Sequence, residues 1–246
     1  MTELSNGLRI FFNWHDRQAV RIATGIHEPT TQEAMHLVLR PGMNCIDVGA
    51  HIGLYTLLMA LVVGQCGKVY AFEPFPDTYD LLVKNIGENH FEDIVFPFKV
   101  ACHYEPGKGQ IFSPCGDDLG PAFVPRRRDA VVTAGLAGID VELARVDDLV
   151  PAQAEIGIVK MDIEGAEPFA LRGMERIVMR DRPVIFTEFN PCCLRQMNES
   201  DPAEYLRWLR SYGYQLFEDR DFIQKTGHEF AWTGGDVTTN LVCVPD

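Results

Sequence analysis

Two short apolar runs, separated by an apolar stretch of helical length, form the strongest pattern in the chain. The run at 43–48 predicts a buried strand. The continuous apolar stretch over about 53–63 predicts a buried helix, which is far too short to cross a bilayer. A second run at 67–73 predicts a parallel strand beside the first. A strand, a helix and a strand in this order predict a βαβ unit.

Strand and helix patterns alternate along the rest of the chain. Helices are predicted at about 31–39, 77–88, 167–179 and 202–212, with Asp201 as the N-cap of the last. Strands are predicted from Leu8 to Phe12 and at 94–102, 156–162, 183–188, 214–218 and 240–244, the last two as an antiparallel pair. This alternation predicts an α/β fold with a mainly parallel sheet.

Residues 103–142 interrupt the alternation. Their Gly and Pro signals predict a β-hairpin and a long loop over the ligand edge of the sheet. We therefore expect an N-terminal extension, 1–40, packed on a single domain, 41–246, that carries an insertion at about 103–142. Arg126, Arg127 and Arg128 are suited to bind a phosphate or carboxylate substrate. A run of charged residues is, however, more often a solvated surface feature.

Composition narrows the classes of function. The 246 residues carry a net charge of -13, which argues against general affinity for nucleic acid or for anionic lipid. Seven cysteines with no C-x-x-C pair indicate reduced thiols rather than a disulfide frame or a zinc site. The first twenty residues lack the apolar core of a signal peptide, so we expect a cytoplasmic protein.

The turn after the first strand indicates which nucleotide the βαβ unit binds. A dinucleotide fold has the first glycine of G-x-G-x-x-G where this chain has Asp47. An aspartate there would repel a pyrophosphate and attract a cationic ligand that has ribose hydroxyls and no phosphate. Glu73, at the end of the second strand, can accept hydrogen bonds from the ribose. S-adenosylmethionine has these properties and is the predicted cofactor.

A second acidic motif follows the strand at 156–162. Period-2 alternation places Lys160, Asp162 and, if the strand continues, Glu164 on one face, at the carboxyl edge where open parallel sheets bind ligands. A structural network of lysine and carboxylates is one interpretation. The functional interpretation has Asp162 facing the methyl group of the cofactor and the incoming nucleophile.

With these motifs together, the chain resembles the FkbM-type family of S-adenosylmethionine-dependent methyltransferases over about residues 25–220. The residues that carry the resemblance are Asp47–Thr56, Val69–Pro74 and Lys160–Glu167, supported by His27-Glu28-Pro29, Val146–Leu149, Leu171-Arg172-Gly173 and the stretch from Pro183 to Glu188. The family implies a Rossmann-like sheet of seven strands in the order 3-2-1-4-5-7-6, with the last strand antiparallel and helices on both faces. His51, where the family more often has Asn, and the segment 113–140 depart from its pattern.

The resemblance also implies where the cofactor lies. Asp47, Gly49, Ala50 and His51 would meet its amino acid part, within a motif that also includes Gly53, Tyr55 and Thr56. Glu73 would hold the ribose, with Pro74 and Phe75 beside the adenosine and Ala101 and Cys102 near the adenine. Glu28 would reach the pocket from the N-terminal segment, unless it only caps the helix that follows.

Methyl transfer to a hydroxyl needs a base, because a hydroxyl has a very high pKa. The candidates are Asp162, Glu164, Glu167, Glu188 and His51, among which Asp162, with Glu188, is favoured because both end central strands. Glu167 could instead complement a helix dipole. Asp162 and Glu164 suggest a divalent metal, but the sequence offers no third ligand at a recognisable spacing, so we predict no metal.

The expected function is O-methylation of a small molecule, a sugar or a natural-product intermediate, as this family's activity implies. N-methylation of a peptide or amine and a non-catalytic module that binds the cofactor are the alternatives. A nicotinamide-dependent oxidoreductase is disfavoured by the missing first glycine. A homodimer is a further candidate state.

Overall fold

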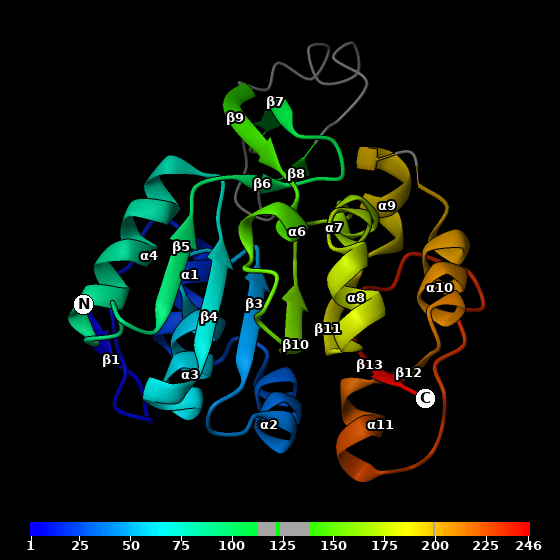
Figure 1. Ribbon diagram of the computed structural model, residues 1–246, viewed down its shortest axis with the longest axis horizontal. Helices are drawn as coiled ribbons and strands as arrows, with labels where there is room; N and C mark the ends of the chain where they lie inside the picture. The colour runs from blue at the N-terminus through cyan, green and yellow to red at the C-terminus, as the bar shows by residue number, and fades with distance from the viewer. Residues whose placement is uncertain (113–121, 124–137, 199) are drawn as a thin grey trace.

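The computed structural model describes residues 1–112, 122–123, 138–198 and 200–246, which form a central twisted sheet with helices on both faces (Figure 1). The seven strands of this sheet, in spatial order, are β12 (Tyr214–Glu218), β13 (Thr239–Pro245), β11 (Val184–Phe189), β10 (Ile156–Met161), β3 (Asn44–Val48), β4 (Lys68–Phe72) and β5 (Val95–Phe98). In chain order this is 3-2-1-4-5-7-6, and β13 runs antiparallel to both of its neighbours. The predicted fold and strand order are confirmed.

Each face of the sheet is buried by its own set of helices. One core cluster joins the sheet to α1 (Arg17–Ala23), α2 (Pro29–Val38), α3 (Leu54–Val63), α4 (Pro76–Glu88) and α11 (Asp219–Gln224). The other joins it to α6 (Val146–Leu149), α7 (Glu167–Gly173), α8 (Glu175–Asp181), α9 (Pro191–Asn198) and α10 (Pro202–Ser211). Strand alternation divides the side chains between the two, since Ile46 and Val48 of β3 belong to the second cluster and Cys45 to the first.

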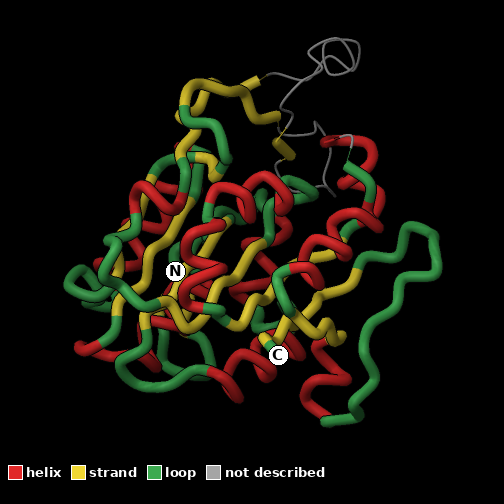
Figure 2. Tube along the Cα trace, turned by 45° about the vertical axis from the view of Figure 1, so that its right-hand side comes forward, coloured by secondary structure: helices red, strands yellow, loops and turns green. Residues whose placement is uncertain are grey.

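The N-terminal segment packs into the first of these clusters. Its strands β1 (Thr2–Glu3) and β2 (Arg9–Ile10) pair with one another, and Ile10, Ala19 and Met35 are fully buried. At the other end of the chain, a long loop, 225–238, joins α11 to β13 (Figure 2). No described helix has both the length and the apolar character needed to cross a membrane.

A second, four-stranded sheet stands over the carboxyl edge of the first (Figure 1). It contains β6 (Ala101–Cys102), β7 (Gly107–Phe112), β8 (Ala122–Phe123) and β9 (Gly138–Ala144), in the order β6-β9-β7-β8. The antiparallel pair β7 and β9 is the hairpin expected within 103–142. The three arginines at 126–128 lie outside the described residues.

Two predicted elements are divided in the structure. The strand expected within 94–102, with an interruption at Pro97, divides into β5 and β6, but Pro97 does not interrupt it and lies inside β5, an edge strand, where a missing N–H is tolerated. The helix expected at 167–179 divides into α7 and α8 at Met174. Gly173 stands there because a Cβ would lie 2.7 Å from the carbonyl oxygen of His103.

The turns after β3 and β10 meet at Gly49. Its φ is +84°, and a Cβ at this position would lie 2.1 Å from the carbonyl oxygen of Asp162. The backbone N–H of Asp162 also donates to the carbonyl of Val48 at 3.0 Å. Glycine is therefore required here both by conformation and by the close approach of the second turn.

We predict that Gly49→Ala destabilises the protein far more than Gly25→Ala. Both glycines have positive φ, but a Cβ at Gly25 meets nothing within 4 Å. Gly25→Ala should therefore cost only the conformational term of about 1–2 kcal/mol, whereas Gly49→Ala adds a backbone clash. Urea unfolding of the two variants measures the difference, and equal losses would contradict the proposed contact between the turns.

Candidate active site

A hollow at the carboxyl edge of the sheet collects most of the predicted site residues. It encloses about 660 Å³ of empty space when its open mouth is included. The predicted residues that line it are Gly49, His51, Glu73, Pro74, Phe75, Ala101, Cys102, Asp162 and Glu164. The turns after β3, β4 and β10, together with β6, thus supply one continuous wall.

The other predicted residues do not line this hollow; several bond to one another. The buried carboxylate of Asp47 accepts a hydrogen bond from the Thr56 hydroxyl at 2.5 Å. The Tyr55 hydroxyl donates to Glu28 at 2.6 Å. Gly53, as the N-cap of α3, donates its N–H to the carbonyl of Ala50 at 2.8 Å. These contacts stabilise the turn after β3 and the start of α3.

Glu73 joins two of the turns at the mouth of the hollow. Its Oε2 accepts from the backbone N–H of His51 at 2.8 Å, and its Oε1 accepts from the Phe75 N–H at 3.0 Å and the Thr78 hydroxyl at 2.9 Å. Burial raises the pKa of Glu73, although these hydrogen bonds and the nearby His51 favour its ionised form. The Glu73 carboxylate therefore connects the turn after β3 to the turn after β4.

The imidazole of His51 has a partner that the sequence did not reveal. His51 adopts a left-handed φ of +51°, and its Nε2 lies 2.9 Å from Asp16 Oδ2 at the start of α1. Gln18, in the same helix, also lines the hollow. The seven residues of α1 give too short a pattern to be recognised, so neither contact was predicted.

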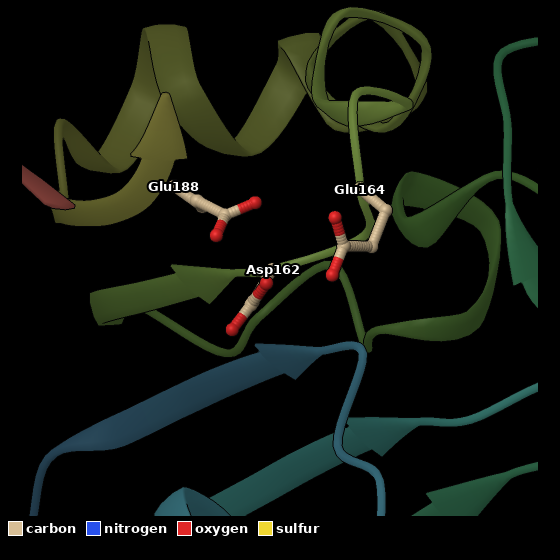
Figure 3. A group of neighbouring side chains, drawn as sticks. All are labelled: Asp162, Glu164 and Glu188. Carbon is tan, nitrogen blue, oxygen red and sulfur yellow. The ribbon is translucent and has the colours of Figure 1, made fainter. Parts of the chain in front are cut away.

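Three carboxylates lie close together near the ends of β10 and β11. One oxygen from each of Asp162, Glu164 and Glu188 lies within 4.8 Å of the others (Figure 3). Asp162 and Glu164 come from the turn after β10, where Glu164 has a φ of +52°, and Glu188 comes from β11. The sequence showed no third ligand, but the structure supplies one on the neighbouring strand, so these three residues could hold a divalent cation.

The surroundings of these carboxylates separate their pKa values. Burial, reinforced by the charge of Asp162, raises the pKa of Glu164 to about 7. Burial and the charges of Asp162 and Glu164 raise the pKa of Glu188 to about 10. Glu188 Oε2 is buried and has no partner among the described residues. At neutral pH, Glu188 therefore holds a proton and Glu164 is close to its titration midpoint.

Lys160 provides the positive charge at the centre of the acidic groups. It is 1% exposed, and its Nζ lies 3.2 Å from Asp162 Oδ2 and 4.9 Å from the centre of the Tyr55 ring. Burial raises the pKa of Glu28, but the charges of Lys160 and His27 outweigh burial and lower it to about 2. Glu28 occupies the N-cap of α2 without a side-chain capping bond; it bonds instead to Tyr55 and Asn240.

Glu167, the remaining predicted candidate for the base, lies beneath the site. It is fully buried and accepts a hydrogen bond from the Ile163 N–H at 2.9 Å, but it does not line the hollow. Burial raises its pKa to about 8. Its position at the first residue of α7 indicates a structural role in the turn.

A family model and several known methyltransferases are similar to this chain. A model described as "Methyltransferase FkbM domain" matches residues 47–216. Methyltransferase sdnD of Sordaria araneosa is 28% identical over 201 residues, which is 71% of this chain and 74% of that protein. A protein-L-isoaspartate O-methyltransferase of Arabidopsis thaliana is 35% identical over 78 residues, 31% of this chain and only 25% of that protein.

Solved structures share the fold at low identity. A putative rRNA methylase from Clostridium thermocellum superposes with a TM-score of 0.53 and 10% identity, covering 87% of this chain and 92% of that one. The FkbM methyltransferase of Methylobacillus flagellatus has a TM-score of 0.48 and 16% identity. That match covers 95% of this chain, which spans little more than half, 56%, of the other protein.

We predict that Glu167→Gln makes stability less dependent on pH. The pKa of Glu167 is about 8 when folded and near 4.5 when unfolded, so between these pH values only the folded state keeps the proton. The free energy of unfolding therefore falls as pH rises from about 5 to 8, by up to a few kcal/mol for this group. A glutamine cannot titrate and should lose that part of the slope.

Urea unfolding at pH 5.5 and pH 8 measures this effect. Glu229→Gln is the matched control, because Glu229 is exposed. Parallel pH slopes for wild type and Glu167→Gln would show that Glu167 does not retain a proton in the folded protein.

Proposed function

The chain belongs to the FkbM methyltransferase domain family and is an S-adenosylmethionine-dependent methyltransferase, and we propose that it methylates a hydroxyl of a small molecule, either a sugar or a natural-product intermediate. The observation that carries this proposal is the position of Glu164. Its carboxyl has a pKa of about 7 and lines the same hollow as Glu73, the proposed ribose ligand. A base matched to neutral pH suits an acceptor that must lose a proton.

The lining of the hollow fits the cofactor at both ends. Phe75, Ala101 and Cys102 offer apolar surface to an adenine ring, and the acidic side suits a sulfonium and an ammonium. Glu73 Oε2 receives one hydrogen bond from the protein, and a carboxylate oxygen has room for a second, here from a ribose hydroxyl. The other predicted cofactor residues do not line the hollow, and we propose that they act by holding its wall in place. They are Glu28, Asp47, Ala50, Gly53, Tyr55 and Thr56.

The acidic residues can then take separate tasks. The cofactor, when bound, supplies a methyl group already activated on a positively charged sulfur. We assign Asp162 to the space beside that methyl and Glu164 to the acceptor proton. Glu188 is a weaker candidate than the sequence suggested, because a carboxyl with a pKa of about 10 already holds a proton at neutral pH. The chain's contribution is therefore to position the two substrates and to take a proton.

The cluster of three carboxylates also bears on metal dependence and on the acceptor. A proton on Glu188 and the positive charge of Lys160 can balance its charge while Glu164 acts as the base, so we propose a reaction that needs no metal. The same acidity supports N-methylation as a second candidate, since carboxylates would attract an amine acceptor. An amine would have to give up its proton before attack, which Glu164 could accept.

The proposed partner is a small molecule rather than a nucleic acid, given the net charge of -13. We place the protein in the cytoplasm as part of the same proposal. The described cysteines are free thiols, which supports a reducing compartment.

We predict that S-adenosylhomocysteine binds saturably in calorimetric titration and that Glu73→Gln weakens it at least about tenfold. Loss of one charged hydrogen-bond partner costs about 1.5–3 kcal/mol, or tenfold and more. Glu33→Gln, at an exposed position of α2, should leave the affinity unchanged. If the wild type does not bind at high micromolar concentration, the proposed function is wrong.

We predict that Glu164→Gln lowers kcat by about 10²–10⁴, the usual contribution of a general base, while the affinity for S-adenosylhomocysteine changes little. The acceptor for this assay comes from a screen of sugars and hydroxylated natural products. In the wild type, kcat/KM should rise with pH through about 7, as Glu164 loses its proton. This rise of kcat/KM with pH should be absent in Glu164→Gln.

Glu92→Gln, an exposed position, is the control for Glu164→Gln. Each rate is measured with EDTA and again with added magnesium chloride, and the two should agree. An unchanged pH profile in Glu164→Gln would exclude Glu164 as the base. A rate that depends on magnesium would contradict the metal-free reaction.

A further inference from the structure

Lys160 is a buried charge that neither the family motif nor the proposed base explains. Burial alone would lower the pKa of a lysine and favour its neutral form. The pKa of Lys160 is instead raised, because the charges of Asp162, Glu28, Asp47 and Glu188 outweigh burial. A permanent ammonium is therefore fixed within the carboxyl edge of the sheet.

The strand register explains why this ammonium lies among carboxylates. Lys160 of β10 pairs with Asp47 of β3 on one side and with Phe186 of β11, two residues before Glu188, on the other. Period-2 alternation turns these side chains to the same face of the sheet. The ring of Tyr55 covers the ammonium from α3 at 4.9 Å. The position of Nζ is thus set by three strands and a helix.

Most of the surrounding acids have their own hydrogen-bond donors, but Asp162 receives its bond from Lys160. Asp47 accepts from Thr56, and Glu28 accepts from Tyr55 and Asn240. Lys160 Nζ lies 3.2 Å from Asp162 Oδ2. Asp162 lines the hollow, whereas Lys160 does not. The ammonium therefore acts on the hollow through Asp162.

Asp162 needs such a partner because it stands beside two other carboxyl groups. Its oxygen lies within 4.8 Å of those of Glu164 and Glu188 (Figure 3). Whenever Glu164 is ionised, its negative charge repels that of Asp162 in this buried site, and the neighbouring ammonium of Lys160 offsets that repulsion. Removal of Lys160 would take away the hydrogen bond that Asp162 Oδ2 receives.

We propose that Lys160 is a positioning residue that holds the Asp162 carboxylate toward the sulfur of the bound cofactor. This inference rests on the proposed function, since it assumes that S-adenosylmethionine occupies the hollow beside Asp162. The sulfur is positively charged in S-adenosylmethionine and neutral in S-adenosylhomocysteine. Lys160 therefore contributes to the preference of the site for the charged ligand.

Calorimetric titration of both ligands into wild type and Lys160→Met tests the proposal. We expect Lys160→Met to weaken S-adenosylmethionine about tenfold and to leave S-adenosylhomocysteine within about twofold. Lys99→Met, an exposed lysine paired with the exposed Asp80, is the control and should change neither affinity. If Lys160 acted only through its own charge, removing it would strengthen binding of the cationic ligand. That result, or an equal loss for both ligands, would overturn the proposal.

Asp162→Asn and the double variant Lys160→Met with Asp162→Asn complete the cycle. If Lys160 works through Asp162, the double variant binds S-adenosylmethionine no more weakly than Asp162→Asn alone. Independent, additive losses would contradict the proposal. If Lys160→Met does not fold, the double variant Lys160→Met with Asp47→Asn replaces it, because this variant loses one buried negative charge together with the ammonium. The ratio of its affinities for S-adenosylmethionine and S-adenosylhomocysteine is then compared with the ratio in Asp47→Asn alone. A wild type that binds neither ligand would instead overturn the proposed function.

Discussion

The arrangement of the carboxyl edge depends on one buried ammonium, because an ammonium without water is stable only among carboxylates. Lys160 lies between β3 and β11, and the acids around it come from four different parts of the chain. Glu28 belongs to the N-terminal segment and is bonded to Asn240 of β13 near the C-terminus. Both residues lie outside the segment 47–216 that matches the family. The site is therefore completed by the two ends of the chain.

A second constraint connects this acidic half to the nucleotide half. Gly49 lies so close to the carbonyl of Asp162 that no side chain fits between the turns after β3 and β10. Glu73 then bonds the turn after β3 to the turn after β4 through the backbone N–H groups of His51 and Phe75. The distance between the proposed ribose site and the acidic cluster is fixed by backbone contacts. Such preorganisation suits a reaction in which much of the catalysis is positioning.

The sequence predicted the sheet because strand periodicity and the turn motifs are local signals. The βαβ unit around Asp47 and Glu73 follows from them, whereas the order of the strands was implied only by the resemblance to the family. Glu188 was expected near Asp162 because both end central strands, but its role as a third possible metal ligand could not be predicted from spacing, since it depends on the register between β10 and β11. Asp16 was missed because α1 is a single short helix. The glycine at 173, beside the break at Met174, is required by the close approach of His103, a residue distant in sequence.

The same constraints give three glutamates of one site very different acidities. The pKa is about 2 at Glu28, about 7 at Glu164 and about 10 at Glu188. Burial raises all three, so the difference comes from their partners. Glu28 has Lys160, His27 and two hydrogen-bond donors, whereas Glu188 mainly faces other carboxyl groups. A fixed negative charge, a group near its titration midpoint and a protonated acid thus stand together. Residues of one chemical type thus acquire separate roles through the charges and hydrogen-bond donors around them.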